Sequence, residues 1–180
     1  MSTKLSEVCG YFTSNSGFQR QRVLQQLIDN INILEKELNE NELKLKDVTA
    51  NIQKCDRYIK QHAPLMLARK EIIESLLENA KTDAARLIQQ DKLKQWKEKF
   101  APIAKAELNL KKYEDIQNEH LSQKMILTES MDNKRIQLQG FLCSIGSHDI
   151  DAPLLEKAKI LIEKIVKDAE ISGMAAAPGA

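Results

Sequence analysis

Glycine, proline and aromatic residues are scarce in this chain. Its 180 residues include 6 Gly and 4 Pro, and the aromatic residues make up 4%. So few turn-forming residues exclude a fold built from many short elements with tight connections, and so few aromatic side chains do not suit an ordinary large globular core. Charged residues make up 29%, and Lys, Glu, Leu, Ile, Gln and Asn predominate. This composition is typical of long, mostly exposed α-helices.

Cysteine is also rare, and long apolar runs are missing. Cys9, Cys55 and Cys143 are odd in number, widely separated and without a CxxC spacing, so neither a disulfide framework nor a zinc site is indicated. Residues 1–10 lack the apolar core of a secretion signal, and no apolar run approaches the roughly 18 residues that span a bilayer. The sequence therefore predicts an intracellular protein with reduced thiols, not secreted and without a transmembrane segment. We expect it in the cytoplasm, with the cytoskeleton, the spindle and the nucleus as candidate sites.

A seven-residue apolar repeat is the strongest pattern present. It comprises Leu24, Ile31, Leu38, Leu45, Ile52, Ile59 and Met66. Apolar residues repeated every 3.5 positions on average predict a helix that supercoils around a neighbouring helix, in this chain or in another. The interface predicted for a partner helix consists of Leu24, Leu27, Ile31, Leu34, Leu38, Leu45, Val48, Ile52 and Ile59.

Asn41 occupies a position in this seam that hydrophobic residues otherwise hold. Two interpretations stay open from the sequence. A single seam Asn often fixes the register and the number of helices at some cost in stability. Alternatively, the side chain turns outward into solvent.

The predicted fold is all-α, an elongated coiled coil or long helical hairpin bundle with three long helices and a shorter C-terminal helix. Pro64 and Pro102 are expected to kink or end helices because proline lacks an N–H group and clashes with the preceding turn. The predicted segments are a flexible or short helical start at 1–17, a heptad helix at 18–63, further long helices at 64–145, an amphipathic helix at 150–172 and a disordered tail at 173–180.

The seam of the later helices is poorer than that of the first. Gln117, Lys124 and Lys134 fall where hydrophobic residues are expected. This region is therefore predicted to be weakly packed or exposed on more faces.

Sequence signatures of catalysis are missing. The chain has no phosphate-binding glycine loop, no GxSxG and no HExxH. His62, His120 and His148 lie in different segments without metal-ligand spacing. We predict a protein that is not an enzyme, with no catalytic, cofactor-binding or metal-binding residues and no cofactor.

One basic segment exceeds the background of a chain whose formal net charge is only +1. Residues 81–112 contain 9 basic and 4 acidic residues. The candidate contact patch for an acidic partner consists of Lys92, Lys94, Trp96, Lys97 and Lys99. Alternatively, these lysines solvate a helix whose Trp96 is a core residue. Lys92, Lys99 and Lys105 do not share one helix face, so specific nucleic-acid binding is not predicted.

Four functional hypotheses follow. The first is a non-enzymatic coiled-coil subunit of a multi-subunit intracellular assembly that binds other coiled-coil proteins, as a hetero-oligomer rather than a homo-oligomer. In general character the chain is similar to subunits of spindle, kinetochore, dynactin-like and augmin-like assemblies, and this resemblance implies a role in the cytoskeleton, with microtubules or in cell division. The alternatives are a membrane-associated tethering or scaffolding module, a scaffold in a nuclear nucleic-acid-processing complex, and a self-contained antiparallel bundle that folds back at Pro64 and Pro102.

Overall fold

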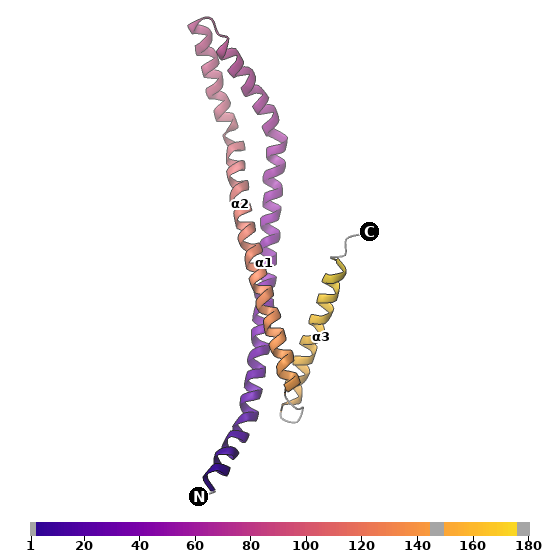
Figure 1. The fold of residues 1–180 in the computed structure, drawn as a ribbon. Helices are drawn as coiled ribbons and strands as arrows, with labels where there is room; N and C mark the ends of the chain where they lie inside the picture. The colour runs from indigo at the N-terminus through magenta and orange to yellow at the C-terminus, as the bar shows by residue number, and fades with distance from the viewer. Residues whose placement is uncertain (1–2, 145–149, 176–180) are drawn as a thin grey trace. The chain divides into compact units, whose positions relative to one another are not determined.

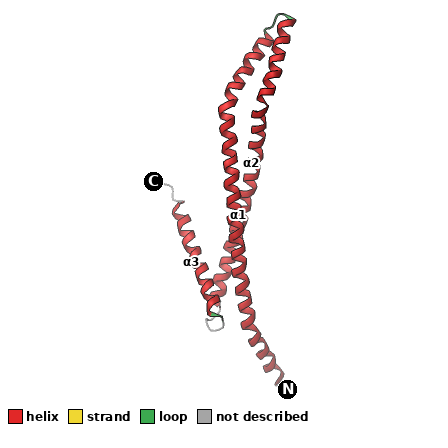
Figure 2. Ribbon diagram, turned by 180° about the vertical axis from the view of Figure 1, so that it is seen from behind, coloured by secondary structure: helices red, strands yellow, loops and turns green. Residues whose placement is uncertain are grey.

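The computed structural model contains three α-helices (Figure 1). They are α1 (Thr3–Glu78), α2 (Asp83–Ser144) and α3 (Ala152–Ala175). The structure describes the backbone at residues 3–144 and 150–175 and the side chains at residues 17–144 and 150–164. Within these ranges there is no strand, and the two longest helices pack against each other (Figure 2). The all-helical prediction is confirmed.

The two internal prolines do not end a helix. α1 contains 76 residues and continues through Pro64, and α2 contains 62 residues and continues through Pro102. A proline inside a helix costs about 3 kcal/mol. Beside each proline lies a buried side chain, Ala63 at the first and Ile103 at the second, so both helices have tertiary contacts where the proline stands. The expectation of three long helices is therefore wrong, because the structure has two.

The chain reverses at residues 79–82 instead. The Asn79 side-chain amide donates a hydrogen bond to the Ser75 carbonyl at the end of α1 (2.8 Å). The Ala85 N–H donates to Thr82 Oγ1 (3.2 Å), and the Arg86 N–H donates to the Thr82 carbonyl (3.1 Å). Thr82 is thus the N-cap of α2, since its hydroxyl satisfies an N–H group that has no partner within the helix.

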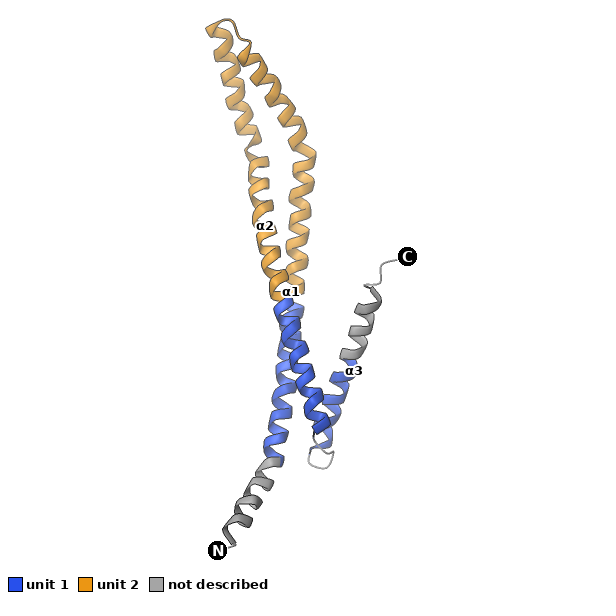
Figure 3. Cartoon of the chain, in the orientation of Figure 1, with its two compact units in different colours: residues 1–40, 125–180 blue, residues 41–124 orange. Residues whose placement is uncertain are grey.

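The residues divide into two compact units, and α1 and α2 each contribute to both (Figure 3). Unit 1 comprises residues 1–40 and 125–180. Its apolar core takes side chains from all three helices, because α3 covers a face that α1 and α2 leave open. The buried core cluster contains Leu24, Leu27, Ile28, Ile31, Met131, Leu138, Leu154 and Ala158.

The start of α3 lies within unit 1 and has a clear local cause. The Asp151 carbonyl accepts hydrogen bonds from the N–H groups of Leu154 and Leu155, both at 3.1 Å. Pro153 stands in the first turn, where no intrahelical N–H is needed. An ion pair between Lys164 of α3 and Glu35 of α1 accompanies the apolar contacts.

Unit 2 comprises residues 41–124 and contains only the two long helices. Hydrogen bonds join Asn41 to His120 and Met66 to Trp96, so the helices run antiparallel. The buried apolar residues here are Ala63, Trp96 and Ile103. A supercoiled geometry of this pair stays a prediction.

The helix bounds at the two ends of the chain differ from the predicted segments. α1 begins at Thr3, whereas residues 1–17 were expected to form a flexible or short helical start. α3 ends at Ala175, close to the predicted boundary at 172. Most of the predicted tail, residues 176–180, lies outside the described residues, as do the side chains of residues 165–175.

Candidate partner-binding surfaces

The nine residues of the predicted partner-helix interface are all buried or half-buried. Leu24, Leu27 and Ile31 are buried in the core of unit 1, and Leu34 and Leu38 pack against it. In unit 2 the half-buried members are Leu45, Val48, Ile52 and Ile59. The neighbouring helix required by the heptad pattern is therefore present within the chain, while contact of these residues with another protein stays a prediction.

Asn41 faces α2, so its outward interpretation is wrong. The side chain is buried, and its Nδ2 donates to the His120 carbonyl at 2.8 Å. A second contact of 2.8 Å joins Asn41 Oδ1 to His120 Nδ1. Because an amide oxygen can only accept, the Nδ1 atom of His120 carries the proton in this pair. A buried polar pair of this kind disfavours other registers, since any shift leaves both groups without partners.

Two of the three polar residues that interrupt the later seam have polar partners on α1. Gln117 Nε2 donates to Thr49 Oγ1 (3.0 Å), and Lys124 Nζ lies 2.8 Å from a carboxylate oxygen of Glu42. The third, Lys134, donates to Gln137 on its own helix. Gln117 and Lys124 thus complement polar positions of α1, and several apolar residues of α2 near them, such as Leu121 and Met125, are exposed.

A second apolar stripe on α1 stays exposed. Tyr58, Leu65 and Ile72 repeat every seven residues, and Leu76 follows one turn later; their exposed fractions are 39%, 62%, 60% and 49%. We call these four residues the outer stripe. Sequence reasoning missed the outer stripe, although its spacing was visible, because Tyr58 and Leu65 directly precede members of the seven-residue repeat, Ile59 and Met66.

Trp96 is a core residue of unit 2, as the alternative interpretation of the basic segment held. Only 8% of its surface is exposed. Its indole N–H donates to the Met66 carbonyl at 2.6 Å, and its ring stacks on Phe100 with centroids 4.7 Å apart. Lys70 Nζ lies 5.5 Å from the centre of the same ring, a cation–π distance.

A cleft of about 170 Å³ lies beside Trp96 in unit 2, and we call it the basic cleft. Its lining residues are Met66, Arg69, Ile73, Lys92, Gln95, Trp96 and Lys99. The structure thus brings Lys92, Trp96 and Lys99 of the predicted patch together, whereas Lys94 and Lys97 are exposed and do not line the cleft. Arg69 was missed because it lies on the other helix, and only the antiparallel register connects it to Trp96.

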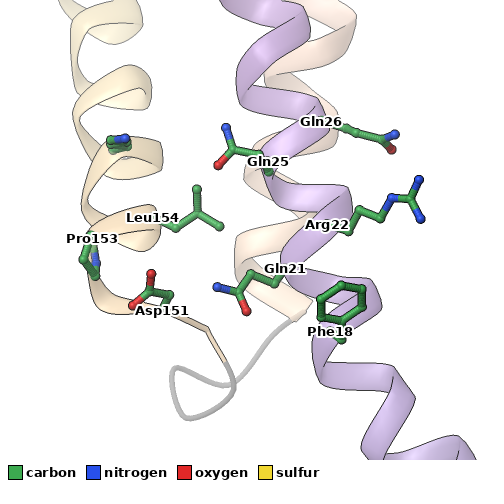
Figure 4. A pocket seen from close by; sticks show the side chains of 9 residues that line it. Phe18, Gln21, Arg22, Gln25, Gln26, Asp151, Pro153 and Leu154 are labelled. Atoms are coloured by element: carbon green, nitrogen blue, oxygen red, sulfur yellow. The ribbon is translucent and has the colours of Figure 1, made fainter.

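A larger cleft, of about 410 Å³, lies in unit 1 between residues 18–26 of α1 and the start of α3. Figure 4 shows Gln21 and Gln25 of α1 pointing toward Asp151 and Leu154. Arg22 also lines this cleft, and in Figure 4 it points away from α3. Its charged lining residues have both signs, so no single ligand chemistry is favoured there.

Within the described residues, no three His, Cys, Asp or Glu side chains gather as metal ligands. No helix in the described part of the chain combines the length and apolar character required to cross a bilayer. Comparison with known proteins yields no relative, since no family model, no curated protein and no solved structure gives a significant match.

Proposed function

We propose that this protein is a non-enzymatic helical subunit of a multi-subunit intracellular assembly, and that it binds helices of other subunits. The observation that carries this proposal is the outer stripe. Residues seven apart in a helix share one face, and Tyr58, Leu65 and Ile72 have this spacing and are exposed. Exposed large apolar side chains that share one helix face favour association with another apolar surface.

The neighbouring residues show how α1 can serve two helices at once. Ile59, Met66 and Ile73 also repeat every seven residues, and each is half-buried in the α1–α2 hairpin of unit 2. The outer stripe is offset from this inner row by one residue, or about 100° around the helix. One face of α1 therefore packs in the hairpin while an adjacent face is available to a partner helix.

A double substitution of Leu65→Gln with Ile72→Gln tests this proposal. Glutamine keeps helix propensity, and both positions are exposed, so the free energy of unfolding of the isolated chain should change by less than about 1 kcal/mol. Assembly should be lost, measured as the size of the tagged protein's complex in native cell extract and as its co-purified proteins.

The matched control is Leu108→Gln with Leu121→Gln. Both leucines lie in the same unit, are exposed and are 13 residues apart, a spacing that places them on opposite sides of α2. This control should assemble normally. A wild-type chain that migrates as a free monomer in extract would contradict the subunit role. Normal assembly of the chain that carries Leu65→Gln with Ile72→Gln would contradict the role of the outer stripe.

Among such assemblies we favour cytoskeletal, microtubule-associated or spindle-associated ones, with a cytoplasmic location. The support is the similarity in general character to small helical subunits of that class. Imaging of the tagged protein through the cell cycle distinguishes the alternatives: filament or spindle staining supports the proposal, and chromatin staining would support a nuclear scaffold instead.

A further inference from the structure

Three cationic side chains line the basic cleft, and no acidic side chain lines it. Arg69 comes from α1, and Lys92 and Lys99 come from α2. All three are exposed, and none forms an ion pair within the described part of the chain. A cleft whose charges share one sign concentrates the opposite charge near it.

The helix pairing explains why these charges meet. Lys92 and Lys99 are seven residues apart and share one face of α2. The hydrogen bond from Trp96 to the Met66 carbonyl fixes the opposing part of α1, and Arg69 follows Met66 by one turn. The convergence is thus maintained by a buried contact and does not depend on flexible surface side chains alone.

Nearby acidic groups reduce the positive charge only in part. A carboxylate oxygen of Glu74 lies 3.5 Å from Lys70 Nζ, and a carboxylate oxygen of Asp91 accepts a hydrogen bond from Gln95 Nε2 (2.9 Å). With these two residues included, the segments that form the cleft, residues 66–74 and 91–99, together contain six basic and four acidic residues. The local excess is +2, in a chain whose formal net charge is +1.

The cleft's size and walls favour a polypeptide as its occupant. Its volume of about 170 Å³ is below the range typical of small-molecule sites, about 300–1,000 Å³. The cations stand beside apolar walls formed by Met66, Ile73 and Trp96. A segment with several carboxylates and one apolar side chain matches both features.

The burial and contacts of Trp96 argue against single-stranded nucleic acid and against membrane lipid as occupants of the cleft. Bases of single-stranded nucleic acid stack on accessible aromatic faces, and membrane-surface proteins insert apolar side chains between lipids. Trp96 is only 8% exposed, stacks on Phe100 and has its N–H group bound. It is therefore not available for either role.

We propose that the basic cleft binds an acidic segment of a partner protein, whose carboxylates contact Arg69, Lys92 and Lys99. This inference rests on the proposed function, because it specifies one contact of a subunit within its assembly.

The single tryptophan of the chain gives a direct assay. Because Trp96 lines the cleft, its fluorescence should change saturably when a synthetic peptide of Glu and Asp residues with one Leu is added to the full chain. The affinity should fall as salt rises, since exposed charges are screened over about 10 Å at 0.1 M salt. A peptide with Gln and Asn in place of the acids should cause no change.

Charge reversal inside and outside the cleft provides the matched comparison. Lys92→Glu with Lys99→Glu should weaken peptide binding by about tenfold or more. Lys94→Glu with Lys97→Glu makes the same change of charge in the same segment, but at residues that do not line the cleft. It should weaken binding by less than about threefold at about 0.15 M salt, because these side chains do not contact the peptide and their charges are partly screened. Circular dichroism establishes that both variants remain helical, and Lys92→Gln with Lys99→Gln replaces the reversal if that variant unfolds.

Equal losses for the two pairs would overturn the proposal, because they would indicate nonspecific attraction. So would an unchanged fluorescence on adding the acidic peptide, or tighter binding to phosphatidylserine vesicles or to single-stranded DNA than to the peptide. If the chain assembles in cells but does not bind the peptide, this inference alone fails. If the peptide binds but the chain is a free monomer in extract, the proposed function fails and the cleft stands.

Discussion

Unit 1 and unit 2 use the same long helices but differ in how completely they bury side chains. In unit 1, Leu24, Ile31 and Leu138 are at most 1% exposed. In unit 2, the corresponding seam residues of α1, such as Leu45 and Ile52, are only half-buried. The difference follows from the number of helices, because two helices cover only one side of a seam and a third closes the other. The same apolar repeat thus produces a core in one unit and a partly open seam in the other.

The two units also differ in what determines their pairing. Unit 1 relies on apolar contacts from three helices. Unit 2 adds polar pairs between α1 and α2, with Asn41 and His120 as the buried one. Polar pairs add modest net stability but strongly disfavour alternative registers. Unit 2 therefore combines a specific pairing with an exposed apolar surface, the outer stripe.

The largest expected effect comes from shortening a leucine in each unit. Leu138→Ala in unit 1 should lower the free energy of unfolding by about 2–5 kcal/mol, because it leaves a cavity in a closed core. Leu45→Ala in unit 2 should lower it by about 1 kcal/mol, since a half-buried side chain loses less apolar contact. Denaturant titration followed by circular dichroism measures both. Equal losses would show that the two units are equally well packed.

An intermediate effect is expected for the buried polar pair of unit 2. Asn41→Ala should cost about 1–3 kcal/mol, because it removes both contacts with His120. His120→Ala should cost less, because the carbonyl of residue 120 still accepts from Asn41 Nδ2. The double variant should cost less than the two single losses added together, with a coupling free energy of about 1 kcal/mol in a double-mutant cycle. Strict additivity would mean that the pair does not contribute to the hairpin's stability.

The smallest change in stability is expected from a substitution in unit 1 that lies outside its core. Gly140 lies inside α2, and a Cβ atom added there meets no heavy atom within 4 Å. Gly140→Ala should therefore stabilise the protein by about 0.5–1 kcal/mol, since it reduces the conformational entropy of the unfolded chain. Thermal unfolding measures the gain. A lower melting temperature would instead reveal a neighbour at this position.

The sequence allowed prediction of the all-helical class, because this class follows from the composition and from the seven-residue repeat. The residues of that repeat are buried or half-buried, while their contact with a partner protein stays a prediction. The number of long helices could not be predicted, because the tolerance of Pro64 and Pro102 depends on packing at Ala63 and Ile103. The turn at residues 79–82 was not predicted, because the sequence analysis placed the chain reversals at the two prolines.

The basic cleft was less predictable than the helices because it combines residues from both helices of the hairpin. The sequence shows the lysines of α2, but Arg69 joins them only through the antiparallel register. Similarly, Gln117 and Lys124 resembled defects until Thr49 and Glu42 were placed opposite them. A sequence pattern describes one helix face at a time, whereas these sites need the partner face as well.

The turn at residues 79–82 has a kinetic consequence. The contacts of unit 2 close progressively longer loops, from 30 residues between Met66 and Trp96 to 79 between Asn41 and His120, and the Glu35–Lys164 contact of unit 1 closes one of 129. Loop closure is entropically cheapest for the shortest loop, and each contact formed shortens the next closure. We therefore expect folding to start at the turn. The contacts nearest the turn should form first, and the three-helix core should be completed last.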